Sequence, residues 1–258
     1  MIYKINQLLV LFFAAYLFSF TCASAEEPRV KPVIVIDPGH GGEELGAMGP
    51  AGLMEKEIVL DISQKLASLI RQRLRAIVRL TRDKDINLSL SDRTKFANDL
   101  HAELFISVHA NASENKQVKG IETYYLDNTN DRSSIRLAER ENFVVGGIKN
   151  NSDLGIIISD LIQSGKMDDS KKLAKSVQGN LISRISKAYS GMNDLGVKKA
   201  PFYVLVGAHM PCILVEVSFI DNDLEGKRLA TEKYRGMIAE SIFEGIVDYY
   251  EDKLNVSQ

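Results

Sequence analysis

Two of the four histidines stand where a parallel sheet would bring them close together. His40 follows the apolar run 33–36 within an Asp-Pro-Gly-His-Gly-Gly segment, and His109 follows the apolar run 105–108. In open α/β sheets, the carboxyl ends of the strands form the crevice in which ligands bind. A single histidine at a strand end is more often structural, but two in matching positions favour a shared metal ion.

Two glutamates are candidates to complete such a site. Imidazole and carboxylate suit zinc, and a catalytic zinc keeps three protein ligands and one open position. By spacing alone, Glu55 is better interpreted as a first-turn acid that complements a helix dipole. Glu216 is the sharper signal, because a carboxylate within the apolar strand 213–217 is costly unless a cation or a metal-associated water lies nearby. Burial would also raise its pKa toward neutrality, as a general base requires.

The elements that must position these residues alternate between strands and helices. The strand-like runs are 33–36, 77–81, 104–108, 121–126, 202–206 and 212–217, and the helical repeats are 58–70, 90–100, 173–189 and 234–250. This alternation predicts one α/β domain with a mostly parallel or mixed twisted sheet flanked by helices, as in phosphorylase- and hydrolase-like folds. The stretch 128–169 is long for a connection, so we expect a helical insertion there.

The first 25 residues have the pattern of a signal peptide. Lys4 precedes the apolar run 8–20, and Ala-Ser-Ala at 23–25 fits a signal peptidase site. The run is shorter than the roughly 20 residues of a membrane span. We therefore expect export with cleavage, leaving residues 26–258 as the catalytic domain without a membrane anchor. A formal net charge of −2 does not favour nucleic-acid binding.

Eight short motifs follow one another along the chain. They are Ile-Val-Ile-Asp-Pro-Gly-His-Gly-Gly at 34–42, Gly-Ala-Met-Gly-Pro at 46–50, Gly-Leu-Met-Glu-Lys at 52–56, Leu-Thr-Arg-Asp at 80–83, Leu-Ser-Asp-Arg at 90–93, Ile-Ser-Val-His-Ala-Asn at 106–111, Gly-Ile-Glu-Thr-Tyr-Tyr at 120–125 and Leu-Val-Glu-Val at 214–217. In this order they resemble the zinc-dependent N-acetylmuramoyl-L-alanine amidases of the AmiC and AmiB type. Glu43-Glu44-Leu45 and Ser218 depart from the family pattern without touching a ligand position.

The resemblance implies a role for each site residue. It makes His40, Glu55 and His109 the zinc ligands and Glu216 the catalytic carboxylate. His101 and His209 match no ligand position and are expected to be structural or surface residues. The implied substrate is peptidoglycan, cut between the lactyl group of N-acetylmuramic acid and L-alanine, in the periplasm during daughter-cell separation.

The insertion carries a further candidate. Residues 131–145 can be drawn as a helix on which Glu141 is a carboxylate on an otherwise apolar face, although a solvated helix end is an equal alternative. The related amidases carry a comparable insert that covers the zinc until an activator, of the LytM type, binds. We hypothesise that Glu141, with Glu139 as runner-up, takes the open zinc position at rest. Residues 156–158 with 161–162 would either dock the activator or form a small core of the insert.

Two other functions remain open on the sequence. A zinc peptidase that acts on another peptide bond would use the same ligands, and it would release a free amino acid from a peptide carboxyl end. A wall-binding module without catalysis is the third possibility. All four site residues are present, which favours an enzyme.

Overall fold

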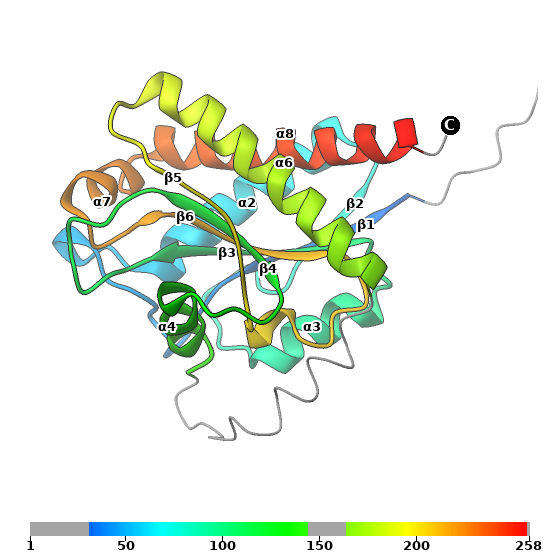
Figure 1. Ribbon diagram of the computed structural model, residues 1–258, viewed down its shortest axis with the longest axis horizontal. Helices are drawn as coiled ribbons and strands as arrows, with labels where there is room; N and C mark the ends of the chain where they lie inside the picture. The colour runs from blue at the N-terminus through cyan, green and yellow to red at the C-terminus, as the bar shows by residue number, and fades with distance from the viewer. Residues whose placement is uncertain (1–30, 144–163, 257–258) are drawn as a thin grey trace, which may run out of the picture. The chain divides into compact units, whose positions relative to one another are not determined.

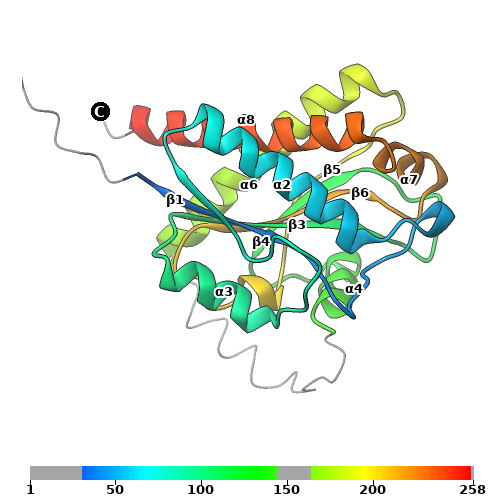
Figure 2. The same ribbon diagram turned by 180° about the vertical axis from the view of Figure 1, so that it is seen from behind.

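A mixed sheet of six strands lies between two layers of helices (Figures 1 and 2). The computed structural model describes residues 31–143 and 164–256. Contacts divide the chain between Lys31 and Pro32, and every element named below belongs to the second unit. The strands are β1 (Val33–Pro38), β2 (Ile77–Leu80), β3 (Leu104–Asn111), β4 (Ile121–Leu126), β5 (Asp194–Ala200) and β6 (Cys212–Phe219). The helices are α2 (Glu55–Arg73), α3 (Leu90–Asp99), α4 (Arg132–Glu141), α6 (Ser164–Ala188), α7 (Asp223–Leu229) and α8 (Glu232–Val256), with short 3-10 turns η1 (Pro50–Gly52) and η2 (Tyr203–Leu205).

The strand order is β2-β1-β3-β6-β4-β5. β1 pairs in parallel with β2 and β3, and β3 pairs in parallel with β6. β4 runs antiparallel to β6, and β5 is parallel to β4. The central strands β3 and β6 are buried along their whole length, which explains their continuous apolar runs. The predicted α/β domain with a mixed sheet flanked by helices is confirmed.

Each face of the sheet has its own hydrophobic core. On one face, α2, α6 and α8 pack over residues such as Ile36, Ile106 and Val215. On the other face, α3, α4 and η2 cover Phe105 and Leu214 (Figure 2). This second face also carries the site, because His109 and Glu216 follow Phe105 and Leu214 in the alternation along β3 and β6.

One predicted strand is wrong. The apolar run 202–206 forms the turn η2 rather than a strand, with Phe202 and Val204 buried in the second core. The strand of this region is β5, which precedes Pro201. β5 lies at the sheet edge and is mostly half-buried, and Gly196 breaks its pattern with a φ of 80°. An edge strand that buries little apolar surface gives no clear alternation, so the sequence did not reveal it.

The insertion contributes one described helix. α4 begins after Asp131, whose carboxylate accepts a hydrogen bond from the backbone N–H of Ser134 at 2.8 Å. This is a helix N-cap. Leu137 and Ala138 bury one face of α4 in the second core. The expected signal peptide at 1–25 and the expected docking segment at 156–162 lie outside the described residues. Within the described part of the chain, no helix combines the length and the apolar character that crossing a membrane requires.

Candidate metal centre and catalytic site

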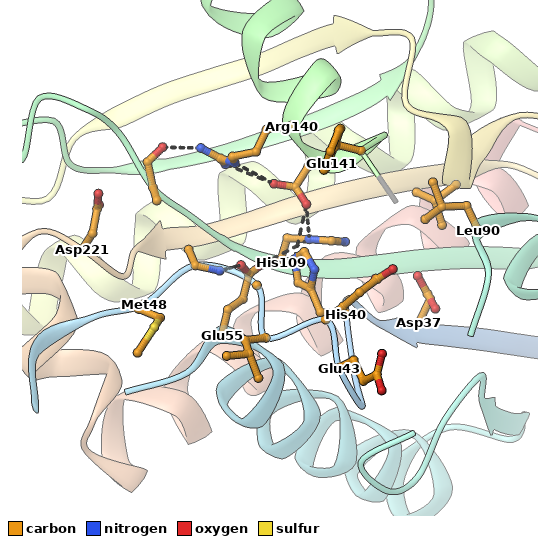
Figure 3. A pocket seen from close by; sticks show the side chains of 18 of the residues that line it. Asp37, His40, Glu43, Met48, Glu55, Leu90, His109, Arg140, Glu141 and Asp221 are labelled. Carbon is orange, nitrogen blue, oxygen red and sulfur yellow. Dashed lines mark hydrogen bonds and ion pairs between the residues drawn. The ribbon is translucent and has the colours of Figure 1, made fainter. Parts of the chain in front are cut away.

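Four side chains from four separate segments converge at the ends of β1 and β3 (Figure 3). His40 follows β1, Glu55 is the first residue of α2, His109 lies on β3, and Glu141 is the last residue of α4. Nε2 of His40 lies 3.1 Å from Oε1 of Glu55 and 3.3 Å from Oε2 of Glu141. Nδ1 of His109 lies 3.2 Å from each of the same two oxygens.

The donor atoms have the spacing of a metal site. Ligand atoms about 2.0–2.2 Å from a tetrahedral zinc are separated by roughly 3.3–3.5 Å, close to the distances observed. Nε2 of His40, Nδ1 of His109 and Oε2 of Glu141 are buried and lack a well-directed hydrogen bond among the described residues. Two imidazoles and two carboxylates that lie this close, without well-directed hydrogen bonds between them, fit a divalent ion.

The imidazoles and carboxylates of the cluster shift one another's pKa values. Burial lowers the pKa of His40, but the Glu55 and Glu141 carboxylates outweigh it and raise this pKa to about 11. The same balance raises the pKa of His109 to about 9. Burial raises the pKa of Glu55, but the two imidazoles bring it down to about 2. A divalent cation would take the place of the protons that the imidazoles otherwise hold.

Glycines near His40 leave space for the side chains of the cluster. A Cβ added at Gly39 would lie only 2.4 Å from Cε1 of His109. Gly46 has a φ of 69°, and a Cβ there would lie 2.6 Å from Oε2 of Glu55. His40 itself has a φ of 55°, a conformation uncommon for a residue with a side chain. The glycines of the His40 loop therefore have steric reasons to be glycines.

Two buried arginines hold this loop in place. Arg93 of α3 donates to Oδ1 of Asp37 at 2.9 Å, to the Pro38 carbonyl at 2.7 Å and to the His40 carbonyl at 2.9 Å. Arg82 donates to the Pro38 carbonyl at 3.0 Å and to the Gly39 carbonyl at 2.6 Å. Charge-assisted bonds to three successive carbonyls stabilise the strained backbone. Both arginines stand in the motifs at 80–83 and 90–93, but the sequence alone does not predict this function for them.

Glu55 is oriented by backbone donors. Its Oε2 accepts from the N–H of Ala47 at 2.7 Å, and its Oε1 accepts from the N–H of Ala110 at 2.9 Å. The second bond is possible because the pairing of β1 with β3 ends at Pro38 and Val108, so the N–H of Ala110 beyond this pair has no strand partner on that side. The structure thus places Glu55 in the cluster, beyond the dipole role that spacing alone favoured.

Glu216 lies next to the cluster on the neighbouring strand. It is the register partner of His109 in the parallel pair of β3 and β6, so the two side chains share a face. The residue is fully buried, and neither carboxylate oxygen has a hydrogen-bond partner among the described residues. Burial, reinforced by the charge of Glu141, raises its pKa well above the usual value. A buried carboxyl group with a raised pKa can take and return a proton near neutral pH.

The remaining candidates lie away from the cluster. His101 and His209 are exposed and contribute no atom to it. Glu139 is also exposed, and it lines a second cavity on α4 rather than the metal centre.

Comparison with known proteins agrees with the geometry. A family model described as N-acetylmuramoyl-L-alanine amidase matches residues 34–248. The chain belongs to this amidase family. It is 36% identical over 231 residues to the amidase AmiC of Escherichia coli O6:H1 strain CFT073, a match that covers 87% of this chain and 54% of that protein. The chain therefore spans about half the length of this curated relative.

Solved structures of amidases share the fold. The amidase AmiC2 of Nostoc punctiforme aligns with a TM-score of 0.66 at 30% identity, covering 86% of this chain and 98% of that chain. The CwlD amidase of Clostridioides difficile, solved in complex with the GerS lipoprotein, aligns with a TM-score of 0.64 at 26% identity, covering 86% and 99%.

Proposed function

We propose that this chain is a zinc-dependent N-acetylmuramoyl-L-alanine amidase. It hydrolyses the amide bond between the lactyl group of N-acetylmuramic acid and L-alanine in peptidoglycan. The observation that carries the proposal is the convergence of His40, Glu55 and His109 beside the buried carboxyl group of Glu216. Membership of the amidase family supports the reaction class.

In this mechanism His40, Glu55 and His109 hold the ion. A bound zinc ion would polarise the scissile carbonyl and make water a better nucleophile at neutral pH. Glu216 takes a proton from the attacking water and delivers it to the departing nitrogen of L-alanine. Its burial suits this task, because the raised pKa of its carboxyl group lets it act as base first and as acid afterwards.

The test is a digestion of purified cell wall with the products identified by mass. Intact stem peptides should appear, their release should stop with a chelator, and it should resume when zinc is added. Glu216→Gln keeps the shape of the side chain but cannot accept the proton, so it should bind zinc and lose turnover by a factor of 10² or more. Release of single amino acids from the peptide end would instead support a zinc peptidase. Binding of wall without any product, also by a Glu141→Ala chain, would support a wall-binding module.

We further propose that α4 holds the enzyme inactive at rest. Oε2 of Glu141 lies 3.3 Å from Nε2 of His40 and 3.2 Å from Nδ1 of His109, where the open ligand position is needed for catalysis. The end of α4 is fixed by Asn142, which donates to the Pro201 carbonyl at 2.9 Å and accepts from the Tyr203 N–H at 2.7 Å. Glu141 is therefore held over the site.

The resting block has a direct test with a matched control. Glu141→Ala should raise basal hydrolysis of peptidoglycan, because it frees the fourth ligand position. Glu139→Ala removes the neighbouring exposed acid from the same helix and should leave basal hydrolysis unchanged. Equal activity of Glu141→Ala and the native chain would contradict the block.

An activator would have to move α4 away from the site. We propose a LytM-type protein in the periplasm as that partner, with daughter-cell separation as the process. The complex of a related amidase with a lipoprotein supports control by a partner in this family. Export through a signal peptide at 1–25 is part of the same proposal.

A further inference from the structure

α4 is attached to the end of β3 by Arg140 as well as by Glu141 (Figure 3). The guanidinium group of Arg140 donates to the Ala112 carbonyl at 2.6 Å and to Oδ1 of Asn111 at 3.0 Å. It also lies 3.1 Å from Oε1 of Glu141. The last turn of α4 therefore presents a carboxylate to the metal centre and N–H donors to two acceptors beside it.

The Asn111 acceptor is fixed in direction by a buried network. Nδ2 of Asn111 donates to Oε1 of Glu122 at 2.7 Å, and Oε2 of Glu122 accepts from Nζ of Lys198 at 2.6 Å. An ionised carboxylate can only accept, so the amide nitrogen of Asn111 must face Glu122. Oδ1 must then face Arg140 and the cavity. Asn111 and Glu122 are both almost fully buried, which makes this arrangement rigid.

These two acceptors lie between two cavities. The metal centre opens into a cavity of about 390 Å³, and a second cavity of about 680 Å³ lies along α4 over Asn111, Glu122 and Lys198. Ala112 and Arg140 line both cavities. Arg140 therefore lies at the boundary between the metal centre and the cavity over Asn111.

We propose that Oδ1 of Asn111 and the Ala112 carbonyl form the subsite that receives the backbone N–H groups of the stem peptide. This inference rests on the proposed amidase function and on α4 leaving the site. Oδ1 of Asn111 also accepts from the Ala112 N–H at 2.7 Å, so Arg140 occupies only its second lone pair. With α4 displaced, this lone pair and the Ala112 carbonyl lose their cationic donor, and an acceptor with a free lone pair favours a new N–H partner. Arg140 and Glu141 then mimic the substrate at rest, the guanidinium group in place of amide N–H groups and the carboxylate in place of the scissile group.

One carboxylate connects the metal centre with Arg140 and its acceptors. Guanidinium nitrogens of Arg140 contact the same carboxylate whose other oxygen faces the two imidazoles. An extended peptide advances about 3.3–3.6 Å per residue. On this proposal, the first N–H groups after the scissile bond meet the acceptors when the bond itself lies at the metal centre.

The test combines enzyme variants with N-methylated substrates. An N-acetylmuramoyl tetrapeptide is compared with analogues that carry N-methyl groups on the second or third peptide nitrogen. In the Arg140→Ala, Glu141→Ala background, in which neither side chain occupies the site, N-methylation at one of these nitrogens should lower kcat/KM by about threefold to tenfold more when Asn111 is intact than in Asn111→Ala, the worth of one hydrogen bond. A folding defect lowers kcat/KM for both substrates by the same factor, so it cancels in this ratio.

Two further variants sharpen the result. Asn111→Asp combined with Glu122→Gln reverses the internal bond but keeps an acceptor facing the cavity, so the N-methyl penalty should return. Glu114→Ala changes an exposed residue in the wall of the same cavity and should leave the penalty intact. The proposed subsite is overturned if N-methylation at each of the two nitrogens lowers kcat/KM by the same factor with Asn111 as with Asn111→Ala.

Failure of the proposed function can be told apart from failure of the subsite. The same comparison is made by calorimetric binding of the peptides to a chain that combines Glu216→Gln with Arg140→Ala and Glu141→Ala, which requires no turnover. If the Glu141→Ala chain releases no stem peptides, the amidase function is overturned. Coupling between Asn111 and the N-methyl groups in binding supports the subsite, and its absence in binding overturns it.

Discussion

Replacing Gly39 with alanine should loosen the metal centre while the fold remains intact. The backbone of Gly39 lies outside the left-handed region, so alanine can adopt its conformation without strain. The added Cβ, however, would stand 2.4, 2.6 and 2.8 Å from three atoms of the His109 ring. The three closest contacts of the added Cβ are therefore all with one proposed zinc ligand.

The size of the effect follows from these distances. Ordinary van der Waals contact begins at about 3.4 Å, so the ring must retreat by about 1 Å. Metal–ligand distances in a working site stay within about 0.2 Å of their ideal values. A displacement of this size should weaken zinc binding on the order of 10- to 100-fold, as loss of ligand orientation does elsewhere. A misplacement of about 1 Å also costs about 10² in rate.

Zinc affinity is measured by competition with a chromophoric chelator, and the fold is followed by circular dichroism and thermal unfolding. Gly236→Ala is the matched control. This glycine lies in α8 with no atom within 4 Å of the added Cβ, and alanine favours a helix by about 1 kcal/mol. The control should bind zinc like the native chain. Native zinc affinity in a folded Gly39→Ala variant would refute the placement of His109 as a ligand.

Three further changes have defined outcomes. Burial alone raises the pKa of the Asp37 carboxyl group, but Arg93 and neighbouring hydrogen bonds bring it below its usual range. The ionised carboxylate thus contributes stability above the unfolded pKa of about 3.9, and this contribution is lost as the pH falls through the lower folded pKa. In urea unfolding, Asp37→Asn should cost about 3–5 kcal/mol at pH 7, and the difference from the native chain should shrink only below about pH 4; a difference constant from pH 7 to pH 2 would contradict the ion pair. Asp131→Ala removes the N-cap of α4 and costs about 1 kcal/mol of helix stability, so basal wall hydrolysis should rise, and an unchanged rate would show that the hold on α4 does not depend on its cap. Removal of zinc should lower the Tm in calorimetry, since a ligand at 100 times its Kd stabilises the folded state by about 2.7 kcal/mol, and an unchanged Tm would argue against a bound ion.

The sequence by itself determined the fold class, the buried central strands and the neighbourhood of the site. Continuous apolar runs identify strands buried on both faces, and the carboxyl ends of parallel strands must meet at one edge. This was enough to predict that His40 and His109 lie close together. It was also enough to predict that Glu216 is buried, because the apolar residues on both sides of it leave no exposed face.

Only the tertiary structure decided which carboxylates join the two imidazoles. Glu55 in a first helical turn satisfies the dipole rule whether or not it points into a site, and its backbone donors come from Ala47 and Ala110, in other segments. Glu139 and Glu141 are equally acidic and only two residues apart, so the rotation of α4 alone separates an exposed side chain from one in the cluster. That rotation is set by Leu137 and Ala138 in the core.

The same reason explains why the strand expected at 202–206 is wrong and why the burial of Arg82 and Arg93 was not predicted. A local pattern records which face of a segment is apolar, but it does not record what the segment packs against. The run 202–206 is apolar because it fills the core beneath α3 as a turn. Arg82 and Arg93 are buried because the carbonyls of the His40 loop accept their charge-assisted hydrogen bonds. Contacts between residues far apart in the chain depend on packing, and packing exists only in the folded molecule.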